Sequence, residues 1–415
     1  MTKSERHYRE ALRLIPWGTQ TNAKRPVESF AGIMPFYIKR GKGCRIWDID
    51  GREFIDYRLS LGPVILGYCY PEVDRAVREQ LKNGVLFSMA SPLELELAKL
   101  VHECVPCADM VRFMKTGEGA NSCAVRIARA YTGRDMIVTC GYQGYPDWFS
   151  TAASPGNGVP AFMKEYVHEI PWGNLEIAEK VIRQYGERLA CVITVPYDLN
   201  ENTSGDFVKL LRNLTGEYGI LLIFDEVLTG FRLSLGGAQE YFGVTPDLAS
   251  FAKAMANGYP ISSFTGKLQY MEKLNDFVLT TTYAGETLSL AAAIATLKIM
   301  RRQKVHKHMW AMGKRLMDGL DTIARHLGVE AHSAGLPPAS FLKFDTRDDE
   351  KNARLDFLFR RELYRQGIFA SVRWFISYSH KKKDIDETLD RARKALRRAL
   401  DAEVSEKNIK PIPAT

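Results

Sequence analysis

The sequence predicts an α/β fold with a large domain built on a mostly parallel sheet. Short apolar, β-branched runs occur at 136–140, 190–195 and 219–226. Segments in which apolar residues recur at helical spacing separate these runs, as in βαβ units. Runs this apolar fit strands that are buried on both faces by flanking helices. At 415 residues the chain is also long enough for two or three domains.

The two ends of the chain carry patterns of their own. In "CRIWDIDGREFIDY" an Asp50-Gly51 turn lies between two β-rich runs and predicts a hairpin. Past residue 285 the chain becomes helical again, "ASFLKFD" predicts a strand, and a final helix is expected from near Asp384. We therefore expect three segments, an N-terminal one at 1–70, the large domain at 71–300 and a C-terminal α/β unit at 301–415.

Composition excludes several classes of protein. Hydrophobic residues are 46% and charged residues 26%, as in soluble globular proteins. No stretch reaches the roughly 18 apolar residues of a membrane span, and the charged N-terminus lacks a secretory core, so we expect a cytoplasmic protein without membrane contact. The net charge is +8, but the basic residues are scattered, and we expect no nucleic-acid partner. The seven dispersed cysteines predict ordinary thiols and no metal site.

One lysine has unusually apolar neighbours. In "SFAKAMANGYP", Lys253 stands among Phe, Ala and Met, just before an Asn-Gly-Tyr-Pro turn. Lysine is seldom buried without a partner. Either its side chain reaches the surface, or its amine is held inside for chemistry. A desolvated lysine has a lowered pKa and can attack carbonyl carbons.

Two other stretches offer groups that such a lysine could work with. Asp225 and Glu226 end an apolar run at the strand end where open α/β sheets bind ligands. An acid buried there needs a cation or a donor, although it could equally cap the next helix. Residues 116–119, Thr-Gly-Glu-Gly, precede a helical segment whose free N–H groups would favour a phosphate. The alternative is an ordinary capped helix, and Glu118 would repel a phosphate unless its side chain turns away.

A lysine nucleophile, a carboxylate and a phosphate cradle together match the needs of pyridoxal 5′-phosphate (PLP). The lysine forms a Schiff base with the cofactor. The acid pairs with the pyridine nitrogen and keeps it protonated, and the helix N-terminus holds the phosphate.

With these residues the chain resembles the class III aminotransferases, which are fold type I PLP-dependent enzymes, and within them the glutamate-1-semialdehyde aminomutase-like branch. The resemblance runs over roughly residues 10–400, in the family's order, through "GKGCRIWDIDGREFIDYRLSLGPVILGYCYPEV", "AVRIARAYTGRDMI", "FDEVLTGFR", "YFGVTPDLASFAKAMANGYP" and "TTYAGETLSLAAA". It implies a large PLP-binding domain and a smaller α/β domain built from the N- and C-terminal segments. It also implies a homodimer with active sites at the interface.

The resemblance implies a role for each matching residue. Lys253 would carry the Schiff base, and Asp225 would pair with the pyridine nitrogen. The other implied cofactor contacts are Thr116, Gly117 and Glu118 at the phosphate, Tyr142 and Val227 on the ring faces, Asn200 near the phenolic oxygen, and Thr282 at the phosphate of the neighbouring subunit's cofactor. The candidate substrate residues are Trp17, Gln20, Gln143 and Arg373.

Three positions depart from the family's pattern. Gln143 stands where histidine is usual, Val195 where glutamate is usual, and Glu118 where a small hydroxyl residue is usual. The lysine and aspartate are kept, so these changes affect the edges of the site, where the substrate is chosen. We therefore expect a biosynthetic aminotransferase that moves an amino group from an amino-acid donor to an aldehyde or keto acceptor by a ping-pong mechanism. An aminomutase or epimerase using the same site is an alternative, and a non-catalytic homologue is a further one.

Overall fold

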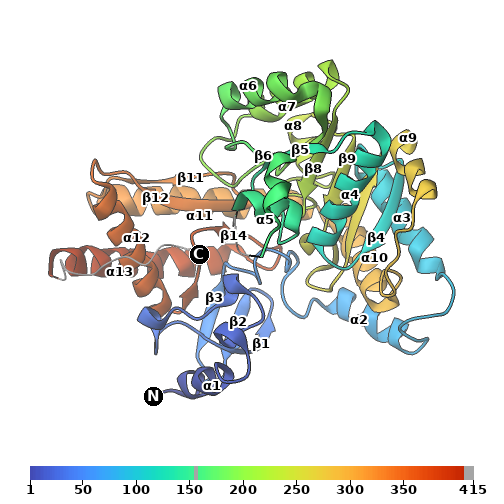
Figure 1. Ribbon diagram of the computed structural model, residues 1–415. Coiled ribbons are helices and arrows are strands. Elements are labelled where there is room, and N and C mark those ends of the chain that lie inside the picture. Colours follow the sequence, from blue (N-terminus) through green and yellow to red (C-terminus); the bar gives the residue numbers. More distant parts are fainter. Residues whose placement is uncertain (154–157, 406–415) are drawn as a thin grey trace. The chain divides into compact units, whose positions relative to one another are not determined.

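The computed structural model describes residues 1–153 and 158–405 (Figure 1). By its internal contacts the chain divides into two compact units. Unit 1 contains residues 1–61, 65–70 and 307 onward, and unit 2 contains residues 62–64 and 71–306.

Unit 2 is built on a seven-stranded sheet. In spatial order its strands are β4 (Met110–Met114), β10 (Ser262–Gly266), β9 (Leu248–Phe251), β8 (Leu221–Glu226), β7 (Leu189–Thr194), β5 (Met136–Cys140) and β6 (Val167–Glu169). The strands from β9 to β6 pair in parallel, whereas β10 is antiparallel to both of its neighbours. The expected mostly parallel α/β sheet is thus confirmed.

The central strands are apolar because both of their faces are covered. Every residue of β5, β7 and β8 is buried, as parallel strands between helices require. Helix α4 packs across β7, β9 and β10 (Figure 1). It brings small residues, among them Ala120, Ala124 and Ala128, against the strands in one apolar core.

Helices make up most of the remainder of unit 2. They are α2 (Pro71–Leu81), α3 (Pro92–Cys104), α4 (Gly117–Thr132), α5 (Asp147–Ala153), α6 (Leu175–Tyr185), α7 (Asp206–Glu217), α8 (Ala238–Phe242), α9 (Leu268–Met271) and α10 (Thr287–Arg302). Helix α10 packs against α2 and α3. Helix α4 ends at Gly133, whose φ of 66° is the left-handed C-cap that glycine adopts most easily.

Unit 1 joins the two ends of the chain in two small sheets. The first has the order β1 (Ile38–Lys42), β2 (Arg45–Asp48), β3 (Glu53–Asp56) and β13 (Ile368–Phe369). In this sheet β2 and β3 form the expected hairpin around Gly51, and β13 adds in parallel to β3. The second sheet has the order β11 (Ala331–Ala334), β12 (Ala339–Phe344) and β14 (Trp374–Phe375), and β12 is the strand expected from "ASFLKFD".

Four helices complete unit 1. They are α1 (Lys3–Ala11), α11 (Val305–His326), whose first two residues belong to unit 2, α12 (Asp349–Arg365) and α13 (Lys382–Ser405). Helix α13 begins two residues before the expected start near Asp384 and buries Ile385, Ala392 and Leu396 on one face. It packs against α12.

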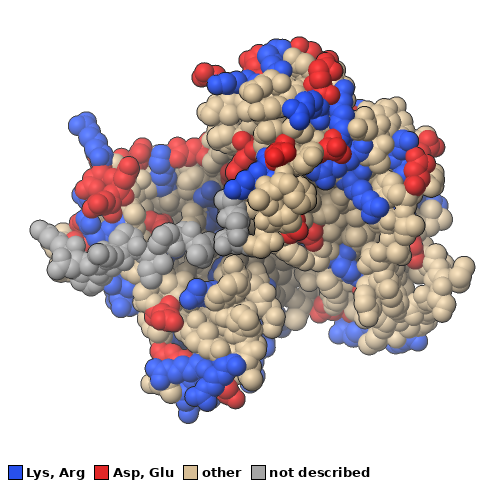
Figure 2. Space-filling model, viewed as in Figure 1, with Lys and Arg blue, Asp and Glu red and all other residues tan. Residues whose placement is uncertain are grey.

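The surface carries mixed charge. Figure 2 shows lysines and arginines interspersed with aspartates and glutamates over the described residues of the face in view. Within residues 1–153 and 158–405, no helix combines the length and the apolar character needed to cross a membrane.

Candidate active site

The carboxyl ends of the parallel strands of unit 2 meet at a point where the strand order reverses. The chain passes from β5 outward to β6, and then returns to build β7, β8 and β9 on the other side of β5. In open α/β sheets this reversal opens a crevice in which ligands bind. The loops that follow β5, β7 and β8 begin there, and they carry Tyr142, Gln143, Asn200 and Val227.

Asp225 lies near the end of β8 and is buried. Its Oδ2 accepts a hydrogen bond from Nδ2 of Asn121 at 2.7 Å, and its Oδ1 accepts one from the backbone N–H of Val227 at 3.0 Å. Burial raises the pKa of Asp225 to about 6, although both hydrogen bonds and the charge of Lys253 lower it. The carboxylate is therefore fixed in place and would be stabilised by a further positive partner.

Asn121 orients this carboxylate, and the sequence analysis did not select it. It lies on the buried face of α4, and its Oδ1 accepts a hydrogen bond from the hydroxyl of Ser250 on β9. Ser250 is the register partner of Asp225 across β8 and β9. The signal in the sequence was a single amide among the small apolar residues of the helix stripe, because a polar group there must find a partner inside the protein.

Glu226, the neighbour of Asp225, has a structural role. It is fully buried and accepts hydrogen bonds from the hydroxyl of Thr229 and from the backbone N–H groups of Ala238 and Gln239, at 2.6–2.9 Å. These N–H groups are the first two of α8, so Glu226 caps that helix. The capping interpretation thus holds for Glu226, and the ligand-binding interpretation stays a prediction for Asp225, because successive strand residues point to opposite faces of the sheet.

Lys253 follows β9 at the start of a short 3-10 helix (Lys253–Ala256) and has a φ of 40°. Its side chain is half-buried, and burial lowers the pKa of its amine, helped by the nearby positive charge of Arg232 and opposed by Asp225. Among the described residues, its Nζ has no hydrogen-bond or ion-pair partner. A half-buried amine with a lowered pKa and no hydrogen-bond or ion-pair partner among the described residues is compatible with the chemical interpretation of "SFAKAMANGYP".

Thr116 and Gly117 form the start of α4. The hydroxyl of Thr116 caps the helix by accepting from the N–H of Gly119 at 3.1 Å. Gly117 lies against Val227, and a Cβ added at Gly117 would come within 2.6 Å of a Val227 methyl. The backbone of α4 can therefore approach the end of β8 only because residue 117 lacks a side chain.

Glu118 turns its carboxylate along the helix. Its Oε1 accepts a hydrogen bond from the hydroxyl of Ser122 at 3.0 Å, and the same hydroxyl accepts one from the indole N–H of Trp148 at 3.1 Å. The carboxylate of Glu118, which would repel a phosphate, is thus bound by Ser122 in the next turn of α4.

The loops after β5 and β7 hold three more selected residues. Tyr142 is 72% exposed and meets Phe149 edge-on at 5.5 Å between ring centroids. Gln143 is buried and donates from Nε2 to the carbonyl of Cys140 at 2.7 Å. Asn200 uses its side-chain oxygen to accept the N–H of Asn202 at 2.9 Å in a local turn. The cofactor and substrate roles of all three stay predictions.

The remaining selected residues lie elsewhere in the chain. Thr282 is exposed, shortly before α10 in unit 2. Trp17, Gln20 and Arg373 belong to unit 1. Trp17 and Gln20 are exposed, and the guanidinium carbon of Arg373 lies 4.2 Å from the centroid of the Phe341 ring. Their roles at cofactor or substrate also stay predictions.

The geometry of unit 2 fits the cofactor expected from the sequence. It offers a half-buried amine without a hydrogen bond or ion pair to the described residues at Lys253, a carboxylate that would gain from a positive neighbour at Asp225, and a helix start at Gly117, which itself has no side chain. These are the donor, acceptor and anion-binding groups that PLP requires. The structure and the sequence-based expectation agree in the kinds of chemical groups and in the helices and strands that carry them.

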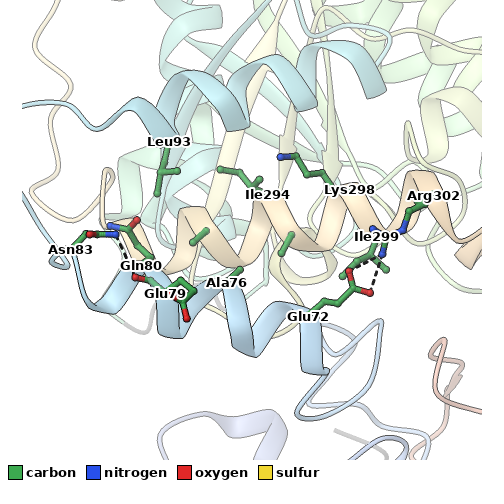
Figure 3. A pocket seen from close by; sticks show the side chains of 12 residues that line it. Glu72, Ala76, Glu79, Gln80, Asn83, Leu93, Ile294, Lys298, Ile299 and Arg302 are labelled. Atoms are coloured by element: carbon green, nitrogen blue, oxygen red, sulfur yellow. Dashed lines mark hydrogen bonds and ion pairs between the residues drawn. The ribbon is translucent and has the colours of Figure 1, made fainter.

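A separate cavity of unit 2 has no comparable set of reactive groups. Figure 3 shows a cavity of about 390 Å³ between α2, α3 and α10, with Ala76 and Ile294 among the residues that line it. At one end Nη2 of Arg302 donates to both carboxylate oxygens of Glu72, at 2.9 and 2.7 Å (Figure 3). Because these opposite charges already meet, we place the chemistry at the strand ends.

Comparisons with known proteins find relatives over nearly the whole chain. The sequence description of the family "Aminotransferase class-III" matches residues 28–396. A glutamate-1-semialdehyde 2,1-aminomutase of Sulfurihydrogenibium azorense is 34% identical over 430 aligned positions, covering 95% of this chain and 99% of the relative. A 3-aminobutyryl-CoA aminotransferase of Cloacimonas acidaminovorans is 33% identical, covering 95% of this chain and 97% of the relative. The PLP-bound structure of the FumI protein of Sphingopyxis sp. MTA144 superposes with a TM-score of 0.90 and 26% identity, over 99% of this chain and 98% of that chain.

Proposed function

This chain belongs to the class III aminotransferase family, whose cofactor is PLP, and from that premise we propose that it is an aminotransferase. It would move an amino group from an amino-acid donor to an aldehyde or keto acceptor, in two half-reactions with ping-pong kinetics. The observation that carries the proposal is the half-buried amine of Lys253, which forms no hydrogen bond or ion pair with the described residues, near the fixed carboxylate of Asp225.

The chain's own residues divide the work. When bound, PLP supplies an aldehyde carbon that amines attack and a ring that accepts electrons. Lys253 would hold that carbon covalently and, once released by the amino donor, its Nζ would take the proton from the substrate carbon bearing the amino group. Asp225 would hold the protonated pyridine nitrogen, and Asn121 would keep the carboxylate in position for it.

The other cofactor contacts are proposed from the same loops. Thr116, Gly117 and Glu118 would present backbone N–H groups to the phosphate. Val227 and Tyr142 would lie against the two ring faces. Asn200 would lie near the phenolic oxygen, which requires its side chain to leave the local turn with Asn202.

An aminomutase of the glutamate-1-semialdehyde type is the second candidate, because the S. azorense relative carries that name. The departure at residue 143 favours the aminotransferase. Gln143 cannot titrate, and its amide is already bonded to the carbonyl of Cys140. The loop after β5 therefore lacks the acid–base group that is usual in the family.

Absorbance of the purified protein separates these possibilities. We expect a visible PLP band that bleaches when the right amino donor is added and returns when a carbonyl acceptor follows. A band that persists while the donor is isomerised would identify a mutase or epimerase. Failure to bind added PLP would contradict the family's cofactor for this chain and leave Lys253 as a structural lysine.

We also propose that the enzyme works as a homodimer. An apolar stretch of unit 2 is exposed, comprising Leu81, Val85, Leu86, Phe87, Met89 and Leu95. It adjoins the segment that carries Thr282, because the N–H of Thr287 donates to the carbonyl of Val85 at 2.9 Å. Monomeric proteins seldom expose so many apolar residues in one stretch. A second copy of the chain would cover them and bring its Thr282 to the partner's phosphate.

Light scattering after gel filtration tests the dimer. The double variant F87S/M89E should shift the protein to a monomer and lower turnover with it. L268E, which changes an exposed leucine on α9, is the matched control and should stay dimeric. A fully active monomeric wild type would contradict the dimer without touching the proposed reaction.

A further inference from the structure

Unit 1 contains a cavity that none of the roles above uses. It has a volume of about 290 Å³ and is formed by the chain between Gly18 and Tyr68 together with Phe369 of β13. On the order of ten waters would fill that volume, so it suits a small organic molecule. Much of its lining is apolar, including Met34, Phe36 and Ile46.

Arg58 lines this cavity and forms no ion pair with the described residues. Its Nε is buried and makes no hydrogen bond, and no ion pair joins its guanidinium to any described residue. The guanidinium carbon lies 5.7 Å from the centroid of the Phe369 ring. The side chain is half-buried, and burial lowers the pKa of the guanidinium although the charges of Tyr364 and Asp56 oppose this. Such a group points to a ligand that supplies the missing acceptor.

Asp56 does not fill this role, although it lines the same cavity. Its Oδ1 accepts the backbone N–H groups of Arg58 and Leu59, at 2.8 and 3.0 Å, and its Oδ2 accepts the hydroxyl of Tyr68 at 2.6 Å. The carboxylate of Asp56 is therefore occupied in shaping the turn that carries Arg58.

That turn is strained. Leu59, Ser60 and Leu61 have φ values of 46°, 56° and 74°, three consecutive residues with side chains in the left-handed region. Strain of this kind persists where the surroundings hold it and is concentrated at functional sites. Here it places Arg58 and Ser60 in the lining of one cavity, and the exposed Lys24 adds a second positive charge to that lining.

We propose that this cavity binds the carboxylate of a small organic acid, with Arg58 as its bidentate partner and the apolar lining around its carbon chain. A planar guanidinium matches a carboxylate with two parallel hydrogen bonds. The ligand is either the acid group of a substrate or a separate organic acid. The binding chemistry is the same in both cases.

Calorimetric titration of the PLP-loaded protein with butyrate and butyramide tests the site. The two probes match in size and differ in charge. We expect butyrate to bind and butyramide to bind at least tenfold more weakly. R58Q should weaken butyrate about tenfold or more and leave butyramide unchanged, while R13Q, which changes an exposed arginine of unit 1, should leave both unchanged. Equal binding of the two probes, or unchanged butyrate binding in R58Q, would overturn the proposal.

The wild-type comparison of the two probes does not depend on whether R58Q folds. Inhibition kinetics then identify the source of the ligand. Butyrate that competes with the amino donor or the carbonyl acceptor represents a substrate's acid group, and butyrate that binds without competing represents a separate organic acid. Titration needs no turnover, so a negative result would leave the proposed aminotransferase standing.

Discussion

The two units each hold a half-buried cation near an acid, and the two pairs permit different chemistry. Lys253 in unit 2 and Arg58 in unit 1 both lack a side-chain hydrogen bond or ion pair with the described residues. Burial lowers the pKa of Lys253, and an amine can give up its proton and attack carbon. Arg58 stays charged and can only bind. The side-chain chemistry thus suits one unit to a covalent reaction and the other to recognition.

The acids near the two cations, Asp225 and Asp56, also differ in how many donors they bind. Asp225 accepts one amide side chain and one backbone N–H and would gain from a positive partner. Asp56 accepts three donors, two of them backbone N–H groups of its own turn. Asp225 accepts one donor on each oxygen and keeps more capacity for a ligand, whereas Asp56 mainly holds the backbone.

The largest effect on turnover should come from replacing Lys253 with arginine, which makes the cation of unit 2 the same type of side chain as Arg58 in unit 1. K253R keeps the positive charge but removes the amine, so we expect turnover to fall by at least about 10³-fold. Steady-state amino transfer and the visible absorbance of the protein measure this. K209R, at an exposed lysine of the same unit, should behave as wild type. Turnover of K253R within tenfold of wild type would remove Lys253 from the reaction.

The next effect separates the two adjacent acids of β8. D225N should lower kcat by about 10²-fold, because the amide cannot hold a protonated ring nitrogen by charge. E226Q should leave kcat within a few-fold, because Glu226 caps α8. E226Q should lower the stability by about 1–3 kcal/mol. Both oxygens of Glu226 accept hydrogen bonds, and the –NH2 group that replaces one of them would face a donor instead of an acceptor. Measuring kcat and Tm for both variants checks this, and the reversed pattern would contradict the assignment.

A smaller effect appears in the protein stripped of PLP. The pKa of Asp225 is raised from 3.8 to about 6 in the folded state, so folding favours its protonated form. The stability that Asp225 contributes is therefore fully present below pH 3.8 and is lost as the pH rises through 6, by about 3 kcal/mol. D225N should gain stability relative to wild type between pH 4 and pH 8. Denaturant unfolding at both pH values measures this, and an equal difference at the two would contradict the raised pKa.

The smallest effect should come from R58K. A lysine keeps the charge of the unit 1 cavity but loses the planar pair of donors, so butyrate binding should weaken only about threefold. Calorimetry distinguishes this from the larger loss expected in R58Q. If R58K and R58Q were equally weak, geometry rather than charge would dominate the site.

Motifs in the sequence predicted the parallel sheet and drew attention to Lys253 and Asp225. Both can be recognised from neighbouring residues, because the strands are short apolar runs and the two charged residues stand within or at the end of such runs. The strand pattern alone left Asp225 and Glu226 undivided, and only the family resemblance selected Asp225 for the ring nitrogen. Their separation depends on which face of β8 meets α4 and which meets α8, a property of the folded sheet.

The sequence did not single out Asn121 or Arg58, and the reason differs between the two residues. Asn121 is one amide in an apolar helix stripe, and its importance rests on Asp225, more than a hundred residues away. Arg58 follows "FIDY" like any arginine at a strand end. Its isolation appears only when Asp56 is committed to the turn and the chain from Gly18 onward encloses the cavity.

The contact between Gly117 and Val227 has a consequence for how this site can evolve. Two segments distant in sequence are held at a spacing that leaves no room for one methyl group, since an added Cβ would lie 2.6 Å from the valine. Positions 117 and 227 should therefore change together, with alanine at 117 tolerated only when residue 227 is smaller. An aligned set of descendants of this chain should show the two positions drifting as a pair.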